Sequence, residues 1–115
     1  MLKLVLVFVA TMISLTTARA AASLVGPVSI PCKQAMSSQD NTSLYVMWIS
    51  GFASAANRLS KSDFLEGKTI FDVLELMNKE CKGQPERSME DVAIAVIAQF
   101  RMEAVAKLQY QKQKK

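Results

Sequence analysis

The chain has 115 residues, of which 14 are basic, 10 are acidic and none is histidine. Without histidine it lacks the commonest general base and a usual zinc ligand, which excludes Ser-His and Cys-His catalysis. The two cysteines, Cys32 and Cys81, are too far apart for a CxxC redox pair, and no glycine-rich phosphate loop occurs. We therefore expect a protein that is not an enzyme and has no cofactor or metal.

Residues 1–20 are typical of a secretory signal peptide. Lys3 supplies the positive charge, an apolar run extends from Leu4 to Leu15, and Ala18-Arg19-Ala20 offers small residues where a signal peptidase cuts. A cut after Ala22 fits the same rule. The apolar run is shorter than the roughly 20 residues that span a bilayer, so we expect cleavage and no stable membrane anchor.

Export leaves residues 21–115 as one small helical domain, which we expect to be in the periplasm. Loss of Lys3 and Arg19 leaves 12 of the 14 basic residues against 10 acidic ones. A net charge near +2 gives no support for nucleic-acid binding. An even number of cysteines in an exported chain favours a structural disulfide, Cys32 to Cys81. This disulfide would close a loop of about 50 residues, which stabilises the fold by roughly 4 kcal/mol in the chain-entropy model.

The mature chain opens with an extended lead-in, residues 21–30, followed by one helical turn over residues 32–36. Residues 37–43 are small and polar and predict a loop that ends in a helix N-cap at Ser43. Asn41-Thr42-Ser43 within this loop matches the N-glycosylation pattern, which matters only in a eukaryotic secretory pathway.

Residues 44–59 predict a helix that is apolar around most of its circumference, which places it in the centre of a bundle. Trp48 is predicted to be a core residue. Gly51 is unfavourable within a helix, and we expect it to allow another backbone or ring to approach closely. In the polar connection that follows, residues 60–68, Phe64 and Leu65 are expected to fold back onto the core, although they are also candidates for an exposed contact site.

Two further helices are predicted. Thr69 and Asp72 match a capping box before an amphipathic helix that reaches Cys81. Ser88 and Asp91 match a second one before a long helix, whose apolar stripe is Ala93, Ile97, Phe100, Ala104 and Leu108. Glu103 and Lys107, four residues apart, predict an ion pair on its polar side. The chain ends in a lysine-rich tail, interpreted as a solvated helix end. The predicted fold class is all-α: a small three-to-four-helix domain with one disulfide.

The mature chain resembles the HdeA/HdeB family of small periplasmic proteins. The resemblance rests on the early Cys32, on a Trp-x-x-Gly-Phe helix that runs to an asparagine, and on a helix that leads into Cys81 and is followed by a proline and a new helix start. The residues after Cys32 that carry it are Trp48, Gly51, Phe52, Asn57, Cys81, Pro85 and Ser88.

Membership would imply one disulfide, no catalysis, a homodimer at neutral pH, and a chaperone that opens in acid to bind unfolded proteins. Without histidine, any acid switch must use carboxylates, and the capping residues Asp72 and Asp91 are natural candidates. The candidate client contacts are Trp48, Phe52, Phe64 and Phe71. The Trp48 helix and the proline after Cys81 are closer to those of uncharacterised relatives than to those of the chaperones. A chain of this kind can keep the family's fold without the chaperone activity.

Two other classes of function fit the same sequence. One is a periplasmic immunity or inhibitor protein of the Tai type, which would bind one secreted partner tightly at neutral pH. The other is a carrier of a lipid or small ligand in the core rich in methionine and phenylalanine; one disulfide and three helices leave little room for a large cavity. Binding of many clients, and only in acid, would indicate the chaperone, whereas tight binding of one partner at neutral pH would indicate the immunity protein.

Overall fold

The computed structural model describes residues 30–115, and the predicted signal peptide and most of the lead-in lie outside the described residues. Over this range the chain forms four helices, α2 (Cys32–Ala35), α3 (Gln39–Leu59), α4 (Ile70–Cys81) and α5 (Met89–Gln113). The only extended pairing among these residues is an isolated bridge between Pro31 and Ser88. The predicted all-α fold class is therefore confirmed.

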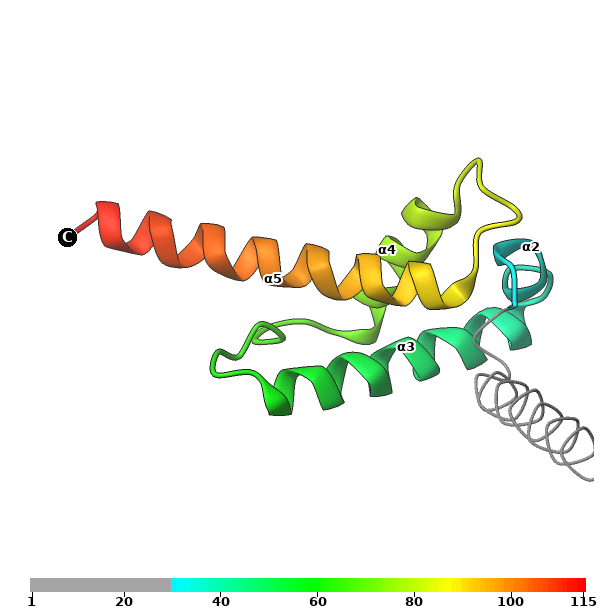
Figure 1. The fold of residues 1–115 in the computed structure, drawn as a ribbon, viewed down its shortest axis with the longest axis horizontal. Coiled ribbons are helices and arrows are strands. Elements are labelled where there is room, and N and C mark those ends of the chain that lie inside the picture. The colour runs from blue at the N-terminus through cyan, green and yellow to red at the C-terminus, as the bar shows by residue number, and fades with distance from the viewer. Residues whose placement is uncertain (1–29) are drawn as a thin grey trace, which may run out of the picture.

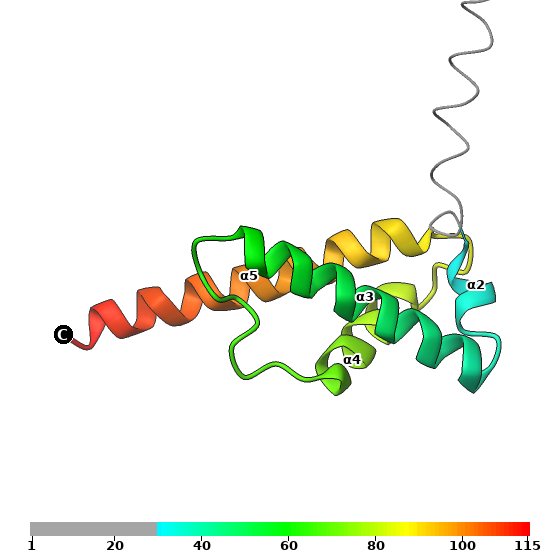
Figure 2. The same ribbon diagram turned by 90° about the horizontal axis from the view of Figure 1, so that it is seen from below.

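The three long helices pack against one another around a single core. In Figure 1, α3 and α5 run roughly side by side and α4 lies behind them; Figure 2 shows α3 in front of the other two. Each helix contributes fully buried apolar side chains. The largest of these are Phe100, Ile49, Met77, Met89, Val92 and Val96.

Helix α3 begins about one turn earlier than the sequence predicted, at Gln39. Ser38 is its N-cap, and its hydroxyl accepts a hydrogen bond from the Asn41 amide at 3.1 Å. Asn41 Nδ2 in turn donates to the Gln34 carbonyl and to Ser37 Oγ. The small polar residues of this stretch thus form a cap and a first helical turn, and the predicted loop with a cap at Ser43 is wrong. The glycosylation pattern lies in this turn.

The predicted start and end of α4 are confirmed. The Thr69 backbone amide donates to Asp72 Oδ2 at 2.7 Å, which closes the capping box. The helix ends before Gly83, whose φ of +71° lies in the left-handed region that favours glycine. At the start of α5 only half of the predicted box forms: Ser88 Oγ accepts from the Asp91 amide, and no return bond from the Asp91 carboxylate is found among the described residues.

Helix α5 extends past the rest of the molecule. Its apolar stripe is buried as far as Phe100, Ala104 is partly buried, and every residue from Val105 onward is exposed. Leu108, predicted as the last member of the buried stripe, is 52% exposed because α3 and α4 do not reach that far. Among the described residues, none of the helices combines the length and the apolar content needed to cross a membrane.

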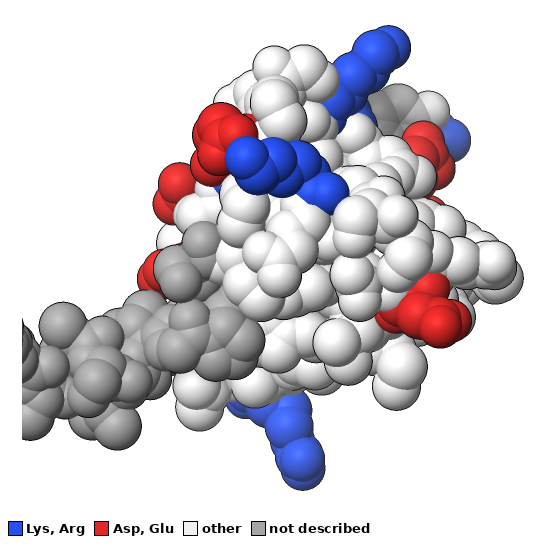
Figure 3. Space-filling view, turned by 90° about the vertical axis from the view of Figure 1, so that its right-hand side faces the viewer, with Lys and Arg blue, Asp and Glu red and all other residues white. Residues whose placement is uncertain are grey.

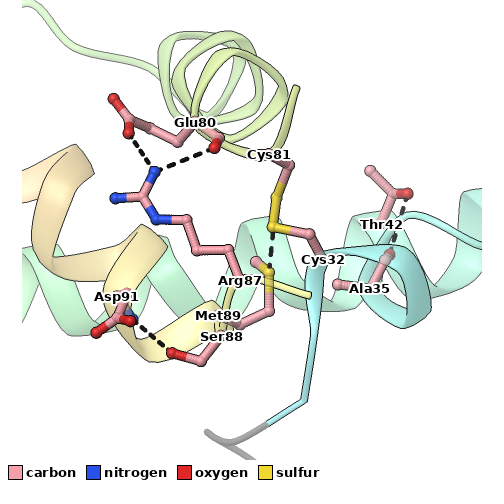
Figure 4. Close-up of a disulfide and its surroundings, with 9 residues drawn as sticks. All are labelled: Cys32, Ala35, Thr42, Glu80, Cys81, Arg87, Ser88, Met89 and Asp91. Carbon is pink, nitrogen blue, oxygen red and sulfur yellow. Dashed lines mark hydrogen bonds and ion pairs between the residues drawn. A yellow bond between two sulfur atoms is a disulfide. The ribbon is translucent and has the colours of Figure 1, made fainter. Parts of the chain in front are cut away.

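Cys32 and Cys81 form the predicted disulfide, with their Cα atoms 5.6 Å apart. The bridge joins α2 to the end of α4, as Figure 4 shows, and Met89 Sδ lies 4.0 Å from Cys81 Sγ. A disulfide sulfur has no proton to donate, so this is a packing contact. Both cysteines and Met89 are buried.

Backbone hydrogen bonds hold the same end of the molecule together. The Cys32 amide donates to the Arg87 carbonyl at 2.8 Å, and the Met89 amide donates to the Ile30 carbonyl at 2.9 Å. Arg87 Nη1 donates both to the Glu80 carbonyl and to Glu80 Oε2, at 3.1 and 2.7 Å. We call this region, residues 30–36 with residues 80–89, the disulfide end.

Candidate protein-binding surface

Helix α3 buries only one of its two apolar faces. Tyr45, Val46, Ile49 and Ala53 face the core. We call the opposite side the outer face of α3, and there Met47 is 70% and Leu59 is 91% exposed. The predicted position in the centre of the bundle is therefore wrong, because α4 and α5 cover one side of the helix and nothing described covers the other. The outer face consists of Leu44, Met47, Trp48, Gly51, Phe52, Ala55 and Leu59.

Trp48 lies at the border between the core and the outer face. It is half-buried, its ring meets that of buried Tyr45 edge to face with centroids 6.4 Å apart, and it stacks on Phe52 at 6.1 Å. The predicted core position of Trp48 is only partly correct. The expected close approach at Gly51 is absent, since no atom of the described residues beyond its chain neighbours and its own helix backbone lies within 4 Å of where a Cβ would stand.

The four candidate client contacts do not form one patch. Trp48 and Phe52 are neighbours on the outer face of α3, whereas Phe71 is 74% exposed in the first turn of α4 beside exposed Ile70. Phe64 is only 2% exposed, because the connection between α3 and α4 folds it into the core. The expectation that Phe64 folds back is confirmed, and Leu65 is half-buried against the same core.

The connection that carries Phe64, residues 60–69, is fixed to α3 by one side chain. Asn57 Nδ2 donates to Asp63 Oδ1 at 2.9 Å, and Asn57 Oδ1 accepts from the Leu65 amide at 3.3 Å. On the other side, the Arg101 guanidinium of α5 lies over the Phe64 ring at 5.1 Å. The sequence singled out Asn57 only as part of a family pattern. In the structure, Asn57 fixes the connection to α3.

Lys68 fixes the end of the connection to α5. Its ammonium group pairs with Glu103 and lies over the Phe100 ring at 5.3 Å, while Gln99 donates to the other Glu103 oxygen at 3.2 Å. The predicted ion pair of Glu103 with Lys107 is wrong, because Lys68 takes that place from a position 35 residues away. We call this region, residues 57–69 with residues 99–104, the Lys68 end.

Two carboxylates near Lys68 have depressed pKa values. The hydrogen bond from Lys68 lowers the pKa of Glu103 below that of an ordinary glutamate, against an opposing effect of desolvation and with help from a hydrogen bond from Gln99. Hydrogen bonds from the Thr69 backbone and side chain lower the pKa of Asp72, and the Lys68 charge adds to this. Both groups therefore favour the charged form while the Lys68 end is closed.

A groove of about 530 Å³ runs between the connection and the exposed half of α5. Its lining mixes acids and lysines, among them Asp63, Glu66, Lys68, Glu103 and Lys107. Within the described part of the chain, no three His, Cys, Asp or Glu side chains cluster closely enough to hold a metal ion. The groove gives no support for one ligand over another.

Comparison of the chain with models of known families, with curated proteins and with solved structures finds no significant match. The resemblance to the HdeA/HdeB family thus stays a prediction from the residues that carry it.

Proposed function

We propose that this is an exported binding protein of the acid-stress chaperone type, which acts in the periplasm on unfolded proteins and catalyses no reaction. The observation that carries the proposal is the closure of the Lys68 end. There an apolar side chain, Phe64, lies in the core, and the connection that carries it is fixed to α5 at Lys68, whose ion pair requires the charge of Glu103. The disulfide, which forms in oxidising compartments, supports export.

The sign of the pH dependence follows from the direction of the two pKa shifts. A carboxylate whose pKa is lower in the folded state than in the unfolded state stabilises the fold above its unfolded pKa. That contribution is lost as the pH falls through the folded pKa. The folded pKa values of Glu103 and Asp72 are both lower than those of ordinary carboxylates, so the Lys68 end opens only in acid.

Opening of this end would expose Phe64 and the Phe100 ring below it. The disulfide at the opposite end would keep α2 attached to α4, so the opened chain would stay compact. Exposed Phe71 and the aromatic pair Trp48 and Phe52 would then add to the apolar surface offered to a client.

The proposal is tested by the aggregation of an acid-unfolded client protein, followed by light scattering at pH 2 to 7. We expect suppression of aggregation only below about pH 4. Glu103→Gln, which removes the charge and keeps the shape, should suppress aggregation at a higher pH than the wild type. Glu75→Gln, at an exposed acid on α4, is the matched control and should behave as the wild type. A protein that stays closed at pH 2 and leaves the client to aggregate contradicts the proposal.

The second candidate is an immunity or inhibitor protein that binds one secreted partner. It is favoured by the outer face of α3, which is exposed without any opening of the molecule. This function requires tight binding at neutral pH with Lys68 and Glu103 still paired. Glu103→Gln should then leave the affinity unchanged, whereas Phe52→Ser should weaken it.

A further inference from the structure

Helix α5 carries a second apolar stripe, on the side that faces away from the core. Its residues follow one another at intervals of four, four, three and three, which keeps them within about a third of the helix circumference. Each large side chain of the stripe is more than half exposed. The stripe consists of Ile94, Ala98, Met102, Val105 and Leu108. Packing within the described part of the chain therefore does not account for these apolar residues.

The part of the chain that extends past the core carries an excess of positive charge. We call this part, residues 101–115, the C-terminal arm. It holds five basic residues and one acid, a net charge of +4, whereas residues 30–100 hold seven basic and nine acidic residues, a net charge of −2. The one acid, Glu103, is paired with Lys68. Among the described residues, no ion pair involves the four lysines of the arm, which are Lys107, Lys112, Lys114 and Lys115.

The opposite end of the molecule has no such separation of charge. Figure 1 shows α5 extending away from the other helices. Figure 3 views the molecule from the disulfide end, where acids and cations lie scattered among uncharged residues. Two ion pairs at this end, Lys33 with Glu86 and Arg87 with Glu80, balance charges locally. Unbalanced positive charge and exposed apolar side chains thus occur together on the C-terminal arm.

We propose that the C-terminal arm binds the surface of an anionic phospholipid bilayer, with its part of the apolar stripe turned into the headgroup region. A basic helix with an exposed apolar stripe suits this boundary, where apolar side chains leave water and cations meet lipid phosphates. Lys112 continues the spacing of the stripe, four residues after Leu108. Lys107 and Lys114 lie on the other side of a helix about 10 Å wide, and their long side chains can reach around it to the phosphates.

The distribution of charge also sets how α5 meets the bilayer. Glu90 and Asp91 are exposed in the first turn of α5, on the same side as the stripe. An anionic surface therefore repels the start of the helix and attracts its end. We expect α5 to lie tilted, with Val105 and Leu108 in the headgroup region and the disulfide end held away from the lipid.

Two simpler explanations cover only part of these observations. The helix dipole favours lysines in the last turn, but it does not favour exposed valine and leucine beside them. A purely acidic partner would attract the lysines and leave the apolar stripe in water. Contact with a bilayer surface uses both features, and it is reversible because no segment spans the membrane. The contact concerns the folded molecule at neutral pH and does not depend on the proposed function.

Flotation of the oxidised mature protein with lipid vesicles, at pH 7 and low salt, tests the contact. Vesicles of phosphatidylglycerol mixed with phosphatidylcholine should bind at least about tenfold more tightly than phosphatidylcholine alone. Lys112→Gln with Lys114→Gln should weaken this binding by more than about tenfold, because each lysine near an anionic surface contributes roughly fivefold. Lys79→Gln with Lys82→Gln removes the same charge at the disulfide end, beyond the reach of unscreened attraction. This matched control should weaken binding by less than about twofold.

The apolar stripe is tested by a second pair of variants. Val105→Gln with Leu108→Gln keeps good helix formers on the arm and should weaken binding to the anionic vesicles by about tenfold. Met47→Gln with Leu59→Gln removes exposed apolar side chains from α3 instead and should leave the binding unchanged. Circular dichroism of each variant shows that the helices are intact.

Three outcomes would overturn the proposal. The first is a wild type that does not float with the anionic vesicles. The second is an equal loss of binding for a test pair and its matched control, which would indicate unspecific adhesion through net charge or apolar surface. The third is unchanged binding of the Val105 and Leu108 variant, with all binding abolished by high salt. In that case the arm meets only charge, as it would on an acidic protein.

Discussion

The two ends of the helical body are closed by different physical means. At the disulfide end, a covalent bond joins α2 to the end of α4, and backbone hydrogen bonds join α2 to the turn before α5. Two ion pairs, Lys33 with Glu86 and Arg87 with Glu80, add to these contacts. At the Lys68 end, a connection of ten residues is held by one asparagine, one buried ring and one ion pair. Covalent and backbone contacts are insensitive to the ionisation of side chains, whereas the Lys68–Glu103 pair requires a charged carboxylate. Protonation would remove the ion pairs at both ends, and only the disulfide end would then keep a covalent bond and backbone hydrogen bonds to the rest of the molecule.

Removal of the disulfide should have the largest effect on stability. We expect Cys32→Ser with Cys81→Ser to lower the free energy of unfolding by about 4 kcal/mol, because the unfolded chain regains the entropy of a closed loop. Urea unfolding measures this, with the wild type under reducing conditions as a second form of the same change. A loss below about 1 kcal/mol would mean that the backbone contacts alone hold this end.

Truncation of Phe64 should come next and should act on the other end. Phe64→Ala leaves a cavity between the connection and α5, at an expected cost of about 3 kcal/mol. Phe71→Ala, at the exposed ring on α4, is the matched control and should cost less than about 0.5 kcal/mol. Equal losses for the two variants, measured by thermal or urea unfolding, would show that Phe64 does not close the Lys68 end.

Neutralisation of Glu103 should have the smallest effect at neutral pH. We expect Glu103→Gln to cost less than about 1 kcal/mol at pH 7, since the pair with Lys68 is partly exposed to solvent. Its diagnostic effect is on the pH dependence: the variant should lose less stability than the wild type as the pH falls below about 4. Parallel curves of melting temperature against pH for the two proteins would rule out Glu103 as part of the acid response.

Local patterns were sufficient to predict most of the fold. The capping box of Thr69 and Asp72, the stop at Gly83 and the disulfide all depend on residues whose local chemistry is specific, and all are confirmed. The start of α3 was misplaced because serine and asparagine serve equally well in a loop, at a cap and in a first turn.

The contacts that close the Lys68 end could not be predicted from the sequence. Glu103 has a lysine four residues away on its own helix, and local spacing favoured that partner over Lys68. The choice is made by tertiary packing, since the connection must return Phe64 to the core and thereby brings Lys68 to α5. In the same way, the composition of α3 showed two apolar faces, and only the placement of α4 and α5 decides which of them is buried.

The difference between the two ends is tested most directly by hydrogen exchange with mass spectrometry at pH 6 and at pH 2.5, with rates corrected for the intrinsic effect of pH. We expect peptides that cover residues 60–69 to lose their protection in acid, while peptides that cover residues 30–36 and 80–89 keep theirs in the oxidised protein. Equal loss at both ends, or protection of residues 60–69 at pH 2.5, would contradict the account.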